Sequence, residues 1–212
     1  KAVVAVDFTG QSVELDRLLT HCREHNLVLI EDGAHVIGTS YKGRMNGSIA
    51  DMTTMSFHPV KTVTGGEGGA VLTNSKEYYE KLLLYRAHGI TRDPKLMEHE
   101  PDGPWYYEQI ALGMNYRMTD MQAALIISQL NKLPRFMERR KAIVKAYNEA
   151  FSRLPQLFVQ QEIPESDTTR HLYILRIRPE KLTIDRKQFF EALAAENICC
   201  NVHYIPTYYF PY

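Results

Sequence analysis

The sequence has no excess of charge of one sign. Lysine plus arginine and aspartate plus glutamate each number 25 among 212 residues, so the formal net charge is zero. Without a basic excess, no long-range field draws the chain to nucleic acid or to an anionic membrane surface. We therefore expect no nucleic-acid or membrane partner, and any anionic ligand has to be held by local groups.

Cysteine is scarce, and long apolar runs are missing. The three cysteines, Cys22, Cys199 and Cys200, form neither a C-x-x-C pair nor a disulfide framework, which suits a reducing compartment. No run approaches the roughly 20 apolar residues of a membrane span, and no signal-peptide pattern is present. We expect a soluble, cytoplasmic protein. The chain opens on an apolar run without methionine and closes on Phe210-Pro-Tyr212, so we expect a piece of a longer protein.

Two common ligand motifs are absent. The glycine run Gly65-Gly66-Glu67-Gly68-Gly69 is not a nucleotide P-loop, because no Lys-Ser or Lys-Thr follows it. Its expected role is conformational, since glycine tolerates positive φ and close backbone approach. A metal hydrolase is conceivable, but its candidate ligands lack tight His-x-x-x-His spacing; they are Asp32, His35, His58 and His203. No metal is expected.

Apolar strands and helices alternate in the first part of the chain. Hydrophobic residues make up 44% of the sequence, enough for a buried core. Strand patterns occur at 3–6, 27–30, 52–57 and 70–73, and helical patterns at 13–25 and 75–86. This alternation predicts an α/β fold with a mostly parallel sheet covered by helices on both faces.

The pattern changes after residue 89. A loop rich in proline, glycine and acidic residues leads to a capping box at Thr119-Asp-Met-Gln122, and Pro134 should end or kink that helix before another runs to about residue 154. Strand, helix and strand patterns follow at 172–177, 186–196 and 200–203. We expect residues 1–118 to form part of a large α/β domain, and 119–212 to hold interdomain helices and part of a smaller α+β domain.

Polar residues follow two of the predicted strands, where ligands of parallel α/β sheets bind. They are Asp32 and His35 after one strand, and Ser56, His58 and Lys61 after another. Singly, Asp32 could cap a turn, His58 before proline could be a turn residue, and Lys61 could serve solubility. Together, a lysine amine, a carboxylate and a hydroxyl are what pyridoxal phosphate (PLP) needs for covalent attachment, a protonated ring nitrogen and phosphate binding.

The stretch EDGAHVIGTSYKGRMNGSIADMTTMSFHPVKTVTGGEGGAVLTN resembles the DegT-type nucleotide-sugar aminotransferases, a fold-type-I, PLP-dependent family. The segments VDFTGQ, GMNYRMTDMQAALIISQL and VHYIPTYY extend the resemblance across essentially the whole chain. The likeness is greatest to the pseudaminic-acid branch, which aminates C4 of a UDP-linked 4-keto-6-deoxy-N-acetylhexosamine. The resemblance implies this activity, with glutamate as amino donor.

The resemblance also implies roles for single residues at the cofactor. It makes Lys61 the catalytic lysine that holds PLP covalently, and Asp32 the partner of the pyridine nitrogen. His35 would lie beside the phenolic oxygen of the cofactor, and Ser56 would bind its phosphate. Lys61 would also move the proton between the substrate carbon and the cofactor.

Other implied residues lie further along the chain. Asn115 and Arg117 would reach across a homodimer interface toward the partner's cofactor phosphate and substrate, which makes the active sites composite. His203 and Tyr204 match a motif near the sugar site, and His58 could contact the sugar. Trp105, Tyr106 and Tyr107 could be a sugar platform or part of the interface.

Two other functions remain open. A dehydratase on the same scaffold requires the lysine to be replaced, commonly by histidine, so Lys61 argues against it. A non-catalytic dimerisation or regulatory module is the second, because family members carry N-terminal and C-terminal segments that this sequence does not contain. Neither the exact sugar nor the aminated carbon follows from the sequence.

Overall fold

The computed structural model describes residues 1–212, which divide into two compact units. The first unit holds residues 1–145 and 161–173, and the second holds 146–160 and 174–212. The first unit thus includes much of the helical region that we grouped with the smaller domain. A boundary at residue 118 stays a prediction about the complete protein.

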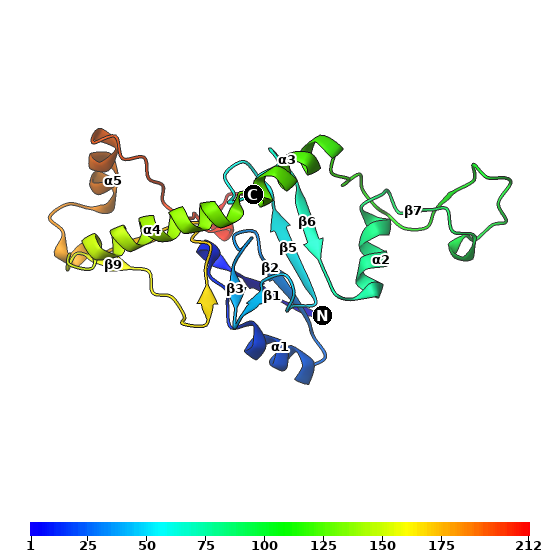
Figure 1. Cartoon of the computed structure of the whole chain (residues 1–212), viewed down its shortest axis with the longest axis horizontal. Helices are drawn as coiled ribbons and strands as arrows, with labels where there is room; N and C mark the ends of the chain where they lie inside the picture. Colours follow the sequence, from blue (N-terminus) through cyan, green and yellow to red (C-terminus); the bar gives the residue numbers. More distant parts are fainter. The chain divides into compact units, whose positions relative to one another are not determined.

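The first unit is built on a four-stranded sheet with the order β1-β2-β5-β6 (Figure 1). β1 (Ala2–Val6), β2 (Val28–Asp32) and β5 (Met52–Ser56) are parallel. β6 (Gly69–Leu72) pairs antiparallel with β5. The prediction of a mostly parallel α/β sheet is confirmed, with each strand close to its predicted position.

The strand register brings the carboxyl ends of the parallel strands to one edge of the sheet. Val6 pairs with Asp32, and Asp32 in turn pairs with Thr54. The backbone amide of Asp7 donates a hydrogen bond to the Asp32 carbonyl at 3.1 Å, which extends the β1–β2 ladder by one residue. The loops that follow β1, β2 and β5 therefore start side by side.

Helix α1 (Leu15–Glu24) packs against one face of this sheet (Figure 1). Its buried Leu15 and Cys22, seven residues apart on one helix face, contact a core that includes Ala5 and Leu29 from the strands. Val4 and Val6 alternate with Ala5 and remain exposed. The expected helical cover on the second face of the sheet is therefore missing over β1 within this chain.

A second core joins the loop after β5 to helix α3 (Asp120–Leu130). Phe57 and Val63 are buried there against Ile126. The predicted capping box of α3 is confirmed: the Gln122 amide donates to Thr119 Oγ1 at 3.3 Å, and the Thr119 amide donates to Gln122 Oε1 at 3.0 Å. Helix α4 (Leu133–Phe151) follows after a short break, and Pro134 lies in its first turn. The break agrees with the expectation that Pro134 ends or kinks the preceding helix.

Shorter elements complete the first unit. Helix α2 (Lys76–Tyr85) is capped by Ser75, which accepts a hydrogen bond from the Tyr78 amide at 3.3 Å. The others are η1 (Phe8–Gly10), β3 (Ser40–Tyr41), β4 (Arg44–Met45), β7 (Ile90–Thr91), η2 (Pro94–Leu96), β8 (Glu108–Gln109) and β10 (Ser166–Asp167).

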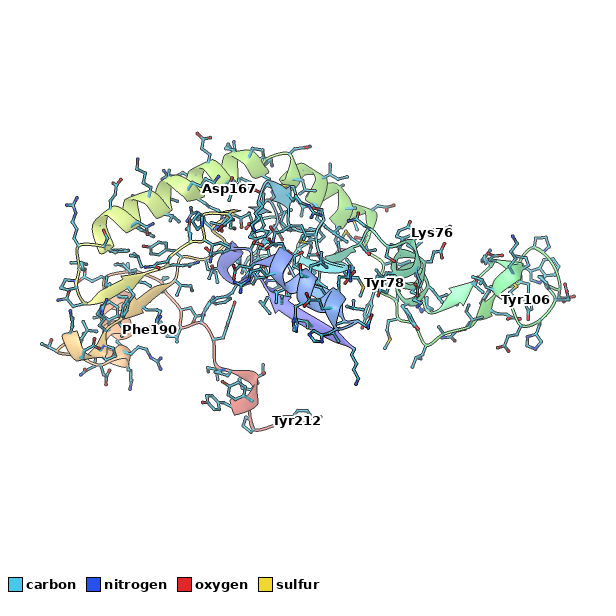
Figure 2. All side chains as sticks on the ribbon, turned by 90° about the horizontal axis from the view of Figure 1, so that it is seen from below. Lys76, Tyr78, Tyr106, Asp167, Phe190 and Tyr212 are labelled. Carbon is cyan, nitrogen blue, oxygen red and sulfur yellow. The ribbon has the colours of Figure 1, made fainter.

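The second unit combines a small sheet with one helix of its own. β9 (Leu157–Val159) and β11 (Leu175–Ile177) are antiparallel, and α5 (Arg186–Ala195), which carries Phe190 (Figure 2), follows the turn η3 (Pro179–Lys181). The last element is η4 (Thr207–Tyr209). Residues 200–203 were expected to form a strand, but they do not, because no strand pairs with them. None of the helices has the length and apolar character to cross a bilayer.

Candidate active site

Lys61 and Asp32 lie close enough to interact electrostatically. Asp32 ends β2, and its Oδ1 accepts a hydrogen bond from the Ala34 amide at 3.1 Å, a turn that orients the carboxylate. Lys61 closes a turn after β5, where its amide donates to the His58 carbonyl at 3.0 Å. Burial lowers the pKa of the Lys61 amine, and the charge of Asp32 opposes that shift. A half-buried amine of this kind releases its proton more readily than a solvated lysine.

Gly33 has a packing role that the sequence did not reveal. A Cβ at Gly33 would lie 2.8 Å from Thr53 Cγ2 and 3.0 Å from the Thr54 carbonyl. Both atoms belong to β5, so only glycine lets the turn after Asp32 approach that strand. Gly33 thus lets β2 and β5 place Asp32 near Lys61.

Ser56 and His58 flank the same turn. The His58 amide donates to Ser56 Oγ at 3.4 Å, so this oxygen acts as an acceptor and its own proton can be donated to a ligand. Ser56 is half-buried, while the His58 side chain is exposed, with Nε2 3.9 Å from Glu67 Oε1. The turn that leads to Lys61 thus carries a hydroxyl donor at Ser56.

His35 lies three residues after Asp32 and is held by the segment that follows β1. The Thr9 amide donates to His35 Nδ1 at 3.3 Å, which leaves Nε2 as the protonated nitrogen of the neutral ring. The His171 and Phe8 rings lie 4.4 and 5.9 Å from the His35 ring, centroid to centroid. Sequence reasoning missed Phe8, Thr9 and His171. The VDFTGQ motif marked the segment that contains two of them, without indicating a role.

A buried pair of carboxyl groups, Asp7 and Glu31, lies beside Asp32 in the sheet, and both side chains are 0% exposed. Asn46 Nδ2 bridges them, at 3.0 Å from Asp7 Oδ2 and 2.7 Å from Glu31 Oε1. The Val13 amide donates to Asp7 at 2.8 Å, and Thr53 Oγ1 donates to Glu31 at 2.6 Å. All these donors are neutral.

Neutral donors cannot balance two buried negative charges. Burial, with the neighbouring Glu31 carboxyl as a second cause, raises the pKa of Asp7 to about 8. At neutral pH the Asp7 carboxyl therefore keeps its proton, which it shares with the neighbouring Glu31 carboxyl. Sequence reasoning missed this pair, since neither residue stands out in the motifs.

Asn115 and Arg117 are exposed in the segment before α3. Asn115 forms an isolated β-bridge with Ala87. The start of α3 nevertheless contacts the glycine loop, residues 65–69, that follows Lys61: Gln122 Nε2 donates to the Glu67 carbonyl at 3.2 Å. The structure therefore leaves the side chain of Arg117 open to a ligand or a partner.

The glycines of this loop permit the close approach. A Cβ at Gly65 would lie 2.8 Å from Ile126 Cδ1, and a Cβ at Gly68 would lie 3.2 Å from Met118 Cε. Gly68 also has a φ of +136°, which favours glycine. The glycine run thus has the conformational role that we expected, because it lets the loop pack closely against α3 and against Met118, which precedes it.

His203 and Tyr204 belong to the second unit. Their rings stack, with centroids 4.2 Å apart and an interplanar angle of 18°. His203 is partly buried and Tyr204 is exposed. Their role near a sugar site stays a prediction.

The chain belongs to the DegT/DnrJ/EryC1/StrS aminotransferase family, whose model matches residues 1–212. The chain is 38% identical over 211 residues to a UDP-4-amino-4,6-dideoxy-N-acetyl-beta-L-altrosamine transaminase of Campylobacter jejuni, covering 100% of this chain and 54% of that protein. The predicted family and fold class, fold-type-I PLP-dependent aminotransferases, are confirmed.

Solved structures agree with this assignment. Helicobacter pylori PseC, an aminotransferase involved in pseudaminic acid biosynthesis, matches with a TM-score of 0.89 and 32% identity over 100% of this chain and 54% of its own. The PLP-form of Spr1654 from Streptococcus pneumoniae matches with a TM-score of 0.81 and 29% identity, covering 97% and 55%. The chain spans about half the length of the curated relatives it matches.

Proposed function

We propose that the complete protein is a PLP-dependent aminotransferase that converts a UDP-linked 4-keto-6-deoxy-N-acetylhexosamine to the 4-amino sugar, with glutamate as amino donor. The observation that carries this proposal is the half-buried Lys61 amine beside the Asp32 carboxylate, at the ends of two neighbouring parallel strands. The Campylobacter and Helicobacter relatives support the sugar class. A dehydratase is not favoured, because the lysine is present.

The residues at this edge of the sheet fit PLP by their chemistry. When bound, PLP supplies a cationic ring that accepts electrons released from the substrate carbon. Asp32 would hold the proton on the ring nitrogen, and Ser56 would donate its hydroxyl proton to the phosphate. His35, protonated on Nε2, would donate to the phenolic oxygen. These three roles need the donors and charges that the structure supplies.

Lys61 would have two tasks. Its lowered pKa favours the neutral amine that attaches the cofactor. With PLP bound, the same Nζ would be placed to act as the base that takes up a proton from the substrate and passes it on. One side chain then serves as covalent anchor and proton carrier.

We place the remaining predicted residues around the substrate and across a homodimer interface. Arg117 would bind the UDP-sugar, Asn115 the partner's cofactor phosphate, and His58, His203 and Tyr204 the sugar. A dimer is supported by exposed apolar side chains that flank Asn115 and Arg117: Leu112 is 85%, Tyr116 75% and Met121 81% exposed. Exposed apolar clusters of this kind commonly mark protein interfaces. The free thiols Cys22, Cys199 and Cys200 suit a cytoplasmic location.

Covalent labelling tests the cofactor assignment. Borohydride reduction of the full-length protein, followed by peptide mapping, should place the pyridoxyl mass on Lys61. Lys61→Ala should lose both the label and turnover, whereas Lys76→Ala, at an exposed lysine that begins α2 (Figure 2), should keep both. A label on any other lysine contradicts the assignment.

Product analysis tests the reaction. With the keto-sugar and glutamate, mass spectrometry should find an amino sugar and 2-oxoglutarate. A product that has lost water without gaining nitrogen would identify a dehydratase. A full-length protein that binds no PLP would identify the non-catalytic module.

Subunit complementation tests the composite site. Mixing inactive Lys61→Ala and Arg117→Ala proteins under exchange conditions should return activity, because each mixed dimer holds one site with both lesions and one site with neither. If mixed dimers form and no activity returns, Arg117 acts within its own subunit.

A further inference from the structure

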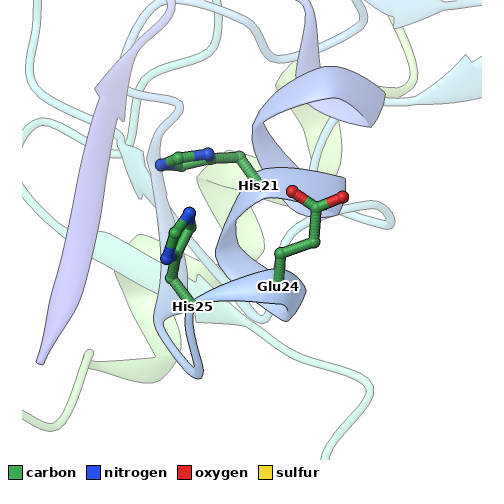
Figure 3. A group of neighbouring side chains, drawn as sticks. All are labelled: His21, Glu24 and His25. Carbon is green, nitrogen blue, oxygen red and sulfur yellow. The ribbon is translucent and has the colours of Figure 1, made fainter.

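The end of α1 and its C-cap residue carry three potential metal ligands on the exposed surface. His21 and His25 are one helical turn apart, Glu24 lies beside them, and their ligand atoms all lie within 4.8 Å of one another (Figure 3). The two imidazole centroids are 4.4 Å apart, with the ring planes inclined by 53°. This cluster lies on a different face of α1 from the buried Leu15 and Cys22, and none of its members has a role in the proposed reaction.

The backbone beneath these ligands is well fixed. The His25 amide donates to the His21 carbonyl at 3.2 Å, and the Leu27 amide donates to the Cys22 carbonyl at 2.8 Å. Asn26 adopts a left-handed φ of +53°, which closes the helix. Cys22 is fully buried in the core below. The three ligands therefore project from a rigid turn, and only their side chains have to adjust.

The local charge favours a cation. The C-terminal end of a helix carries partial negative charge on its unpaired carbonyl groups. The neighbouring Arg23 does not oppose it strongly, because its guanidinium forms two hydrogen bonds with Asp51, at 2.6 and 3.1 Å. The Glu24 carboxylate adds a negative charge to the cluster.

We propose that His21, Glu24 and His25 form a binding site for a divalent transition metal of the zinc class. Two imidazoles and one carboxylate are a typical zinc ligand set, whereas Mg²⁺ and Ca²⁺ prefer oxygen ligands. Zinc–nitrogen bonds of about 2.0–2.1 Å place tetrahedral ligands about 3.3 Å apart, so small rotations of these exposed side chains complete the set. Water fills the remaining positions.

A metal at this place would brace the end of α1 and the turn that leads into β2. Its ligands belong to the native turn and are not held together in the unfolded chain, so binding stabilises the folded protein. The His-x-x-x-His spacing of residues 21–25 is visible in the sequence, away from the strand ends where the candidate ligands were sought. The proposal is independent of the aminotransferase assignment.

Zinc titration of the full-length protein tests the site. The titration uses protein prepared without a polyhistidine tag, and Cys199→Ser and Cys200→Ser remove the exposed thiols of this chain that could also bind zinc. Calorimetry with ZnCl₂ should find one site per chain, and the unfolding temperature should rise with zinc. His21→Ala and His25→Ala should each weaken binding at least about tenfold, and Glu24→Gln by less.

His99→Ala is the matched control. His99 is another exposed histidine paired with a glutamate, Glu108, at 2.9 Å, but it has no second histidine beside it. This variant should bind zinc as the parent does. Co²⁺ in place of zinc should give a visible d–d spectrum that is lost in His25→Ala. The proposal is wrong if no saturable site is found, if His21→Ala and His25→Ala bind normally, or if His99→Ala weakens binding equally. Because all the substituted side chains are exposed, circular dichroism should show unchanged folds.

Discussion

Two neighbouring parallel strands, β1 and β2, each place an aspartate at the same edge of the sheet. The two aspartates differ in their burial and in the groups around them. Asp7 follows β1, is fully buried and is enclosed by neutral donors and the Glu31 carboxyl. Asp32 ends β2, is half-buried and interacts with the charge of Lys61. The position at a strand end is therefore shared by a structural and a candidate catalytic carboxyl. What decides between them is whether the surrounding groups close over the carboxyl or leave it open to a ligand.

The largest expected difference between the two aspartates is in the turnover rate after each is replaced by asparagine. Asp32→Asn should lower kcat about 100-fold or more, because a neutral amide cannot keep the cofactor ring nitrogen protonated. Asp7→Asn should keep most of the activity, since an amide replaces the donor of the protonated carboxyl. Steady-state kinetics of the full-length proteins measures both. Near-normal turnover of Asp32→Asn would refute its assigned role.

The largest expected loss of stability comes from breaking the hydrogen bonds that surround Asp7 and Glu31. Asn46→Ala removes the donor that bridges Asp7 and Glu31, and a loss of about 3 kcal/mol is expected from the two buried groups left without it. Asn74→Ala is the control, because its exposed amide donates to the Ser48 carbonyl at 3.2 Å and water can replace that bond. Its expected loss is below about 0.5 kcal/mol. Chemical denaturation compares the two, and equal losses would mean that burial of the bridge is unimportant.

The raised pKa of Asp7 predicts a pH dependence of stability. Between the reference pKa of 3.8 and the native value of about 8, the folded protein keeps a proton that the unfolded chain has lost. The stabilisation from Asp7 is thus complete below the lower value, and it is lost as pH rises through the higher one. Unfolding free energies measured across this window should fall with pH, and Asp7→Asn should flatten the slope. An unchanged slope in Asp7→Asn would contradict the shared proton.

The smallest expected effect concerns hydrogen bonds that water can replace. The capping box of α3 is also a reciprocal pair, in which each side chain accepts from the other residue's backbone amide, but Thr119 is exposed. Thr119→Ala should therefore cost only about 1 kcal/mol, well below Asn46→Ala. Thr119→Ser, which keeps the hydroxyl, should restore most of that loss. Equal losses of unfolding free energy in Thr119→Ala and Asn46→Ala would contradict the view that solvent exposure makes the Thr119 bonds less important.

Local patterns predicted much of the fold. Apolar runs located β1, β2, β5 and β6, and the Thr119–Gln122 motif located the start of α3. Each of these signals lies within a few consecutive residues. The expected strand at 200–203 was wrong because a strand also needs a partner, which no local pattern reports.

Some contacts of the candidate site could likewise be predicted from local patterns, and others could not. Lys61 and Asp32 could be paired from the sequence, because both follow apolar strands that the sheet brings together. The contact between Thr9 and His35 could not, since it joins residues 26 positions apart through a backbone amide at a left-handed turn. The shared proton of Asp7 likewise depends on burial that arises only when β1, β2 and the segment at Asn46 come together.

The contact between the glycine loop and α3 restricts how this protein can evolve. A Cβ would lie 2.8 Å from Ile126 at Gly65 and 3.2 Å from Met118 at Gly68, so a larger residue in the loop requires that side chain to shift or to be smaller. Glu67 escapes this restriction, because it holds Gln122 through its carbonyl oxygen and its side chain is exposed. Substitutions in the glycine loop should therefore covary with positions near the start of α3 more than with positions in the flanking strands. The two regions are far apart in the sequence: Glu67 and Gln122, which share a hydrogen bond, are 55 residues apart.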